Sequence, residues 1–198
     1  MTASRITTLF AVTAATLAVG FAATPGFAQM KNETMMSDKP VTVGGAPMYG
    51  SKNIVENAAK SKDHTTLVAA VKAAGLVETL QGAGPFTVFA PTNKAFEKLP
   101  AGTVDTLLKP ENKSKLSSVL TYHVVAGRLS AKDLMEAAKK NGGKHKLKTV
   151  QGEELTVSTE GDKVIVWDSK GTRSTITIQN VFQSNGVIHV IDSVLLPA

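Results

Sequence analysis

The 198-residue chain has a formal net charge of +6, from 22 Lys and Arg against 16 Asp and Glu, and it contains no cysteine. The missing cysteine excludes disulfides and an acylated lipoprotein cysteine from this chain. The basic excess predicts mild attraction to anionic surfaces. It is too small, and aromatic residues are too few, to indicate nucleic-acid binding.

The first 28 residues have the pattern of a secretory signal peptide. Arg5 precedes an apolar run, and Gly26 and Ala28 have the spacing that a signal peptidase reads. Threonines interrupt the run and make it a weak membrane span. We therefore expect cleavage after Ala28 and a secreted or periplasmic protein with no membrane span after cleavage.

The next segment, residues 29–50, mixes polar residues with Gly and Pro and shows little periodicity. We expect a flexible N-terminal tail that docks only near its end. A single folded domain is placed at residues 51–198. Its length is enough for one hydrophobic core.

The domain begins with the 3.6-residue period of helices. Apolar stripes predict helices between residues 51 and 80, with a stop at Gly75. A short buried strand is expected at residues 86–90, because β-forming residues follow Gly-Pro punctuation. Thr92 or Asn93 then caps another helix.

Helices are also expected at residues 103–108 and 111–122. The spacing of apolar residues on the second of these directs His123 towards the apolar side. Ser130 and Asp133 form the two ends of a capping-box pattern, which predicts one more helix.

The remainder of the chain has the signals of strands separated by short turns. The expected strands are residues 144–150, 153–159, 163–168, 174–181 and 187–196. The connections are too short for helical crossovers, so successive strands should be mostly antiparallel. Helices first and strands later predict an α+β domain.

Three segments carry a family resemblance. GPFTVFAPTNKAFEKLP (84–100), LTYHVVAGRLSAKDL (120–134) and NGVIHVIDSVLLP (185–197) resemble the hallmark segments of a fasciclin domain, in the expected order. The chain is similar in particular to single-domain secreted bacterial fasciclin proteins. The resemblance implies a wedge-shaped antiparallel β-sandwich with a packed N-terminal helical bundle.

The resemblance also implies an extracellular adhesion module without catalytic activity. In animal matrix members, a Tyr-His pair with flanking aliphatic residues and an Asp-Ile pair are implicated in adhesion. This chain has Asn in place of that Asp, so the carboxylate is missing. The candidate adhesion residues are Tyr122, His123, Leu120, Val124, Val125, Asn180 and Val181. Helical spacing favours a structural role for His123 instead, because it directs the ring inward.

A basic cluster near the middle of the domain supplies a second candidate surface. It comprises Lys139, Lys140, Lys144, Lys146 and Lys148, together with His145. Charge alone could bind anionic glycans, lipopolysaccharide or an acidic surface polymer. The alternative is a solvated helix end and hairpin.

Catalytic and metal sites are not expected. His189, Asp192 and Ser193 could supply a hydrolase triad, but the chain has no G-x-S-x-G elbow. On a regular strand, His189 and Asp192 would point to opposite faces. The four histidines lack metal-binding spacings, and no phosphate-binding loop is present. We predict no enzyme, no cofactor and no metal.

The resemblance implies, and the missing catalytic motifs agree with, a non-enzymatic adhesion module for cell-cell, cell-surface or matrix attachment. Its partner would be a cell-surface or matrix protein or a glycan, or a second copy of the chain. The alternative is an envelope protein that binds glycans or small ligands, linked to stress or host association.

Overall fold

The computed structural model describes residues 40–198. The predicted signal peptide and residues 29–39 of the expected tail lie outside this part of the chain. None of the helices formed by residues 40–198 combines the length and the apolar character that a membrane span requires.

The last part of the expected tail forms an ordered hairpin. Strand β1 (Val41–Val43) pairs antiparallel with β2 (Ala46–Met48) around a Gly-Gly turn with positive φ angles. Val43 and Met48 are buried in the same core cluster as the helices. The polar composition of residues 29–50 conceals these two anchors, so the folded part begins before residue 51.

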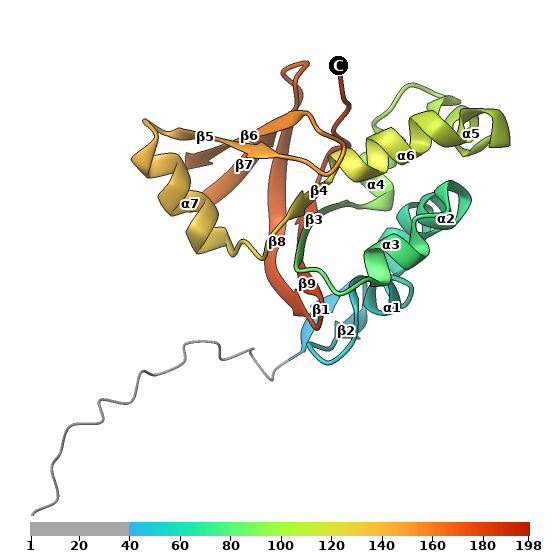
Figure 1. The fold of residues 1–198 in the computed structure, drawn as a ribbon, viewed down its shortest axis with the longest axis horizontal. Helices are drawn as coiled ribbons and strands as arrows, with labels where there is room; N and C mark the ends of the chain where they lie inside the picture. Colours follow the sequence, from blue (N-terminus) through green and yellow to red (C-terminus); the bar gives the residue numbers. More distant parts are fainter. Residues whose placement is uncertain (1–39) are drawn as a thin grey trace, which may run out of the picture. The chain divides into compact units, whose positions relative to one another are not determined.

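Six helices follow the hairpin or lie between the first strands, and they pack together on one side of the sheet (Figure 1). They are α1 (Ile54–Ala58), α2 (Thr65–Ala74), α3 (Val77–Gln81), α4 (Asn93–Glu97), α5 (Thr103–Leu108) and α6 (Lys113–Tyr122). Two 3₁₀ turns, η1 (Lys62–His64) and η2 (Pro110–Asn112), lead into α2 and α6. The helix expected at 111–122 therefore starts two residues later.

Local capping fixes several helix boundaries. The left-handed Gly75 ends α2, and the Thr92 side chain accepts a hydrogen bond from the Ala95 N–H at the start of α4. Ser130 and Asp133 form a complete capping box on α7 (Ala131–Lys140). Such caps satisfy backbone groups that a helix end leaves free, and these predictions are confirmed.

Seven strands form one sheet in the order β4-β3-β9-β8-β7-β6-β5. Their bounds are β3 (Phe86–Pro91), β4 (Val124–Ala126), β5 (Lys144–Lys148), β6 (Glu154–Glu160), β7 (Lys163–Trp167), β8 (Arg173–Gln183) and β9 (Gly186–Ile191). All neighbouring pairs are antiparallel except β3 and β9, which run parallel. A bridge between Val125 and Thr149 joins the two ends of the sheet and makes it barrel-like.

Two apolar clusters hold this arrangement together. One joins the helices to residues of β3 and β9, and the other lies between the sheet and α7. Strand β9 contributes to both clusters, and all six of its residues are buried. The α+β prediction is confirmed.

Candidate functional site

The Tyr-His pair lies where α6 ends and β4 begins. The His123 Nδ1–H donates to the Val119 carbonyl at 2.7 Å, and Nε2 accepts a hydrogen bond from the Leu195 N–H at 3.0 Å. Complete burial lowers the pKa of His123 to about 4. The ring is therefore neutral at pH 7, and both of its nitrogens are hydrogen-bonded to backbone groups.

The Tyr122 side chain is also held by hydrogen bonds within the fold. Its hydroxyl donates to the Glu154 carbonyl at 3.1 Å and accepts from the Ser169 N–H at 3.0 Å. Burial raises the pKa of Tyr122 above its ordinary value. The two side chains thus connect α6 to β6, to the β7–β8 turn and to the C-terminal segment.

Six of the seven candidate adhesion residues are buried, Asn180 being the partly exposed one. The residues most closely matched to the family's adhesive pairs therefore do not form a contact surface in this structure. Asn180 has a φ of 60°, and its side-chain oxygen accepts a hydrogen bond from the Ala131 N–H at 2.8 Å. It holds the start of α7 against β8.

His189 has its own set of partners. Its Nδ1 accepts from the Asn180 N–H at 3.3 Å, and its Nε2–H donates to the Leu129 carbonyl at 2.9 Å. The ring stacks on Phe89 with centroids 5.9 Å apart. Burial lowers the pKa of His189, so this imidazole is also neutral. These contacts give His189 a structural role in the last strand.

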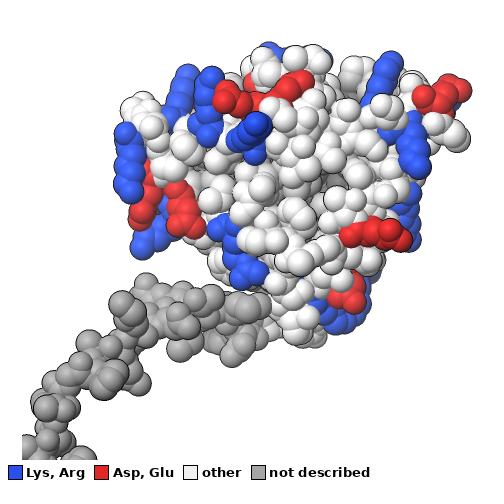
Figure 2. Space-filling model, in the orientation of Figure 1, with Lys and Arg blue, Asp and Glu red and all other residues white. Residues whose placement is uncertain are grey.

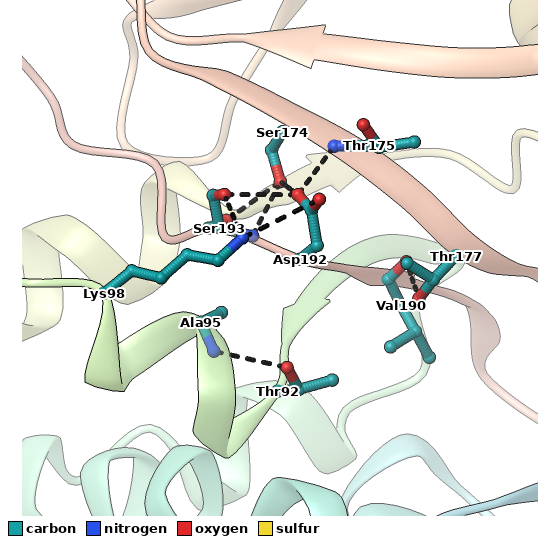
Figure 3. Close-up of polar contacts among 9 residues, drawn as sticks. All are labelled: Thr92, Ala95, Lys98, Ser174, Thr175, Thr177, Val190, Asp192 and Ser193. Atoms are coloured by element: carbon teal, nitrogen blue, oxygen red, sulfur yellow. Dashed lines mark hydrogen bonds and ion pairs between the residues drawn. The ribbon is translucent and has the colours of Figure 1, made fainter.

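Asp192 lies beyond the end of β9 among hydroxyl and amide donors (Figure 3). Its Oδ1 accepts from the Thr175 N–H at 2.9 Å and from the hydroxyls of Ser174 and Ser193, each at 3.2 Å. Lys98 Nζ lies 3.8 Å from the other carboxylate oxygen and 3.2 Å from the Ser193 hydroxyl. Partial burial raises the pKa of Asp192, but these donors and Lys98 outweigh it, so the net pKa is lowered.

This cluster does not assemble a hydrolytic triad from the residues that the sequence offered. The nitrogens of His189 and His123 contact backbone groups elsewhere, and the hydroxyl of Ser193 contacts Lys98 and Asp192. A triad requires the imidazole to reach both the nucleophile and the carboxylate. In the described part of the chain, no group of three or more His, Cys, Asp or Glu side chains could hold a metal ion.

The basic surface consists of the lysines that end α7 and line β5. All five are exposed: Lys139, Lys140, Lys144, Lys146 and Lys148. Figure 2 shows Lys and Arg side chains gathered at the α7 and β5 end of the view, with acidic side chains among them. Lys146 pairs with Glu154 at 2.9 Å, and the pKa of Lys146 is raised by that hydrogen bond.

An open groove of about 620 Å³ lies beside this basic surface. Its lining includes Asn141, Lys144, His145, Lys146, Thr156 and Trp167. Trp167 is the single tryptophan of the chain and is half-buried. The lysines are predicted from the sequence, whereas Trp167 is not. The turn signal at residues 160–162 could have placed Trp167 beside β6.

The helix bundle packs on a mostly antiparallel, barrel-like sheet, and the buried Tyr-His pair lies at their junction. This arrangement is a fasciclin-type fold. The family model for the fasciclin domain matches residues 62–197, and the chain belongs to the fasciclin family. It is 44% identical over 196 residues to the protein sll1483 of Synechocystis sp., covering 99% of this chain and 98% of that protein.

Two further similarities place the chain in a wider setting. It is 43% identical over 122 residues to the cell surface glycolipoprotein MPB83 of Mycobacterium bovis, covering 62% of this chain and 48% of that protein. It also resembles the solved FAS1 domain pair of the insect cell adhesion molecule fasciclin I, with a TM-score of 0.65 and 20% identity. That match covers 73% of this chain and about half, 51%, of the domain pair.

Proposed function

We propose that this protein is a secreted or periplasmic attachment module that joins cells to one another, to a surface or to a matrix. It binds its partner and makes or breaks no covalent bond. The observation that carries the proposal is the division of polar groups in the fold. His123 and His189 are buried with both ring nitrogens hydrogen-bonded, whereas the basic surface is exposed.

The names of two similar proteins support this function. MPB83 is named as a cell surface protein and fasciclin I as a cell adhesion molecule. Adhesive function requires a stable exposed surface more than a reactive group. The partner would be a cell-surface or matrix protein, a glycan, or a second copy of the chain.

Deletion of the gene in its source cells tests this proposal. We expect reduced aggregation, biofilm formation and host attachment, with recovery when the wild-type gene is returned. A variant with Lys139, Lys140 and Lys148 changed to Glu should restore less attachment than wild type. The lysines attract an anionic partner surface, whereas glutamates at the same positions would repel it. A matched control changes three lysines at the other end of the domain, Lys62, Lys94 and Lys109, to Glu. Attachment that is unchanged by deletion would refute the proposal.

A second candidate function is favoured by the groove beside Trp167. An envelope protein that binds a glycan or another small ligand, linked to stress or host association, needs a concave surface of this kind. A glycan array and native mass spectrometry on the purified protein separate this candidate from attachment through a protein partner. Retained glycans or ligand adducts support it, and attachment without either supports the first.

A further inference from the structure

We propose that the groove between the end of α7, strand β5 and Trp167 binds an acidic saccharide. The ring of one sugar unit would pack against the indole, and a carboxylate of the saccharide would lie near Lys144. This inference deepens the proposed function and rests on it for the idea that the protein meets an external partner.

The register of the sheet brings the key side chains together. Lys146 lies opposite Thr156, and Thr156 lies opposite Trp167, so the three occupy one cross-strand row. Lys144 is two positions before Lys146 and therefore shares its face of β5. The cation, the hydroxyl and the indole are held by three neighbouring strands, which fixes their relative positions.

The indole is held in place before any ligand arrives. Its Nε1–H donates to the Ser158 hydroxyl at 2.8 Å, and Ser158 is itself buried. This bond satisfies the one polar group of the ring and leaves the carbon surface to face the groove. A rigid aromatic surface loses little conformational entropy when a ligand packs on it.

The charges around the groove favour an anion. Residues 139–148 contain five lysines and no carboxylate. Both acidic side chains of β6 are already paired, Glu154 with Lys146 and Glu160 with Arg173. Among residues 40–198, Lys144 has no carboxylate within ion-pair distance, and it is one of the residues that line the groove.

The combination of groups selects a saccharide over other anions. A sugar ring has an apolar C–H face that fits an aromatic surface. Its hydroxyls can donate to the side-chain oxygen of Asn141, whose NH2 group already contacts Ala137 and His145, and can bond to the Thr156 hydroxyl. Ligand sites in general combine an apolar surface with a few polar groups that set orientation. A peptide polyanion would use the lysines but has no ring for the indole.

Trp167 provides a direct measurement, because it is the one tryptophan in the chain. The purified full-length protein is titrated with alginate hexasaccharide while tryptophan emission is recorded. We expect a saturable change in emission with alginate and little change with the neutral maltohexaose. Polyglutamate of similar charge should displace bound alginate hexasaccharide poorly.

Matched variants localise the binding. Binding of dye-labelled alginate hexasaccharide is measured by fluorescence anisotropy for wild type and for Lys144→Glu, Lys94→Glu and Trp167→Leu. Lys94 lies on α4, among the helices at the other end of the domain. Lys94→Glu makes the same change of charge as Lys144→Glu and serves as its control. We expect Lys144→Glu and Trp167→Leu each to weaken binding about tenfold and Lys94→Glu to leave it unchanged. Thermal denaturation confirms that each variant is folded.

Several outcomes would overturn the inference. They are equal losses in the Lys144 and Lys94 variants, competition by polyglutamate as strong as by alginate, or saturation without a change in tryptophan emission. If the Trp167 variant fails to fold, Trp167→Phe and the emission titration keep the test decisive. These assays use no cells, so failure here would leave the result of the gene-deletion experiment independent.

Discussion

The Leu195 N–H donates to Nε2 of His123 at 3.0 Å, across 72 positions of sequence. Through this bond, the imidazole at the end of α6 holds the segment that follows the last strand. The Nδ1–H of the same ring bonds to Val119 one turn earlier in α6. His123 is thus a connector between the helical half of the domain and its C-terminal segment.

Replacing His123 with Ala should lower the free energy of unfolding by about 3 kcal/mol, because it leaves a cavity and two unpaired backbone groups. Urea denaturation measures the loss. The control is His145→Ala at a half-buried position, with an expected loss below about 0.5 kcal/mol. Similar stability in both variants would contradict a connecting role for His123.

Acid should destabilise the protein through the same ring. The folded pKa of His123 is about 4, below its ordinary 6.5, so its contribution is complete above pH 6.5 and is lost as the pH falls towards 4. The full shift corresponds to about 3 kcal/mol. His189 and His64 have pKa values lowered by burial and act in the same direction. Urea denaturation at pH 7.5 and pH 4.5 should show the loss, and His123→Gln should reduce it. Equal stability of the wild type at both pH values would refute this prediction.

Asn180 should tolerate Asp better than Ala. Ala removes the acceptor for Ala131 and fits a φ of 60° poorly, so we expect a loss of about 1.5 kcal/mol. Asp keeps the acceptor and places its charge at the N-terminus of α7, so stability should change by less than about 0.5 kcal/mol. Thermal denaturation of both variants checks the order. The reverse order would show that capping is not the function of this side chain.

Asp192 and Lys98 should contribute unequally although they form an ion pair. Asp192→Ala removes the acceptor for Thr175, Ser174 and Ser193 and should cost about 1.5 kcal/mol. The Lys98 side chain is 56% exposed, so Lys98→Ala should cost less than about 0.5 kcal/mol. Chemical denaturation of the two variants measures the difference. Equal losses would show that the ion pair, rather than the hydrogen bonds, holds the end of β9.

Much of the helical structure could be predicted because its signals are local. The helix at Thr103–Leu108 and the capping box at Ser130 and Asp133 depend on residues within a few positions of one another. The β1–β2 hairpin could not, because its stability comes from burying Val43 and Met48 against helices that follow later in the chain. Composition alone makes that segment resemble a tail.

The sheet was predicted in content but not in arrangement. Alternation along the strand expected at residues 187–196 assigned His189 and Asp192 to opposite faces, but Asp192 lies beyond the end of β9. All of β9 is buried, because one of its faces packs with the helical cluster and the other with the cluster that includes α7. The parallel pairing of β3 with β9 has no local signal, since the two strands are far apart in sequence. The groove could not be predicted for the same reason, because its lining residues come together only through the pairing register of three strands.

The position of β9 in the sheet has a consequence for biosynthesis. This strand lies between β3 and β8, yet it is the last of the strands in chain order. A growing polypeptide therefore carries β3 with one edge unpaired until residues 186–191 have been made. Pairings between such distant segments slow folding. The domain should consequently acquire protease resistance in a single late step, after its C-terminal strand has left the ribosome, rather than element by element during synthesis.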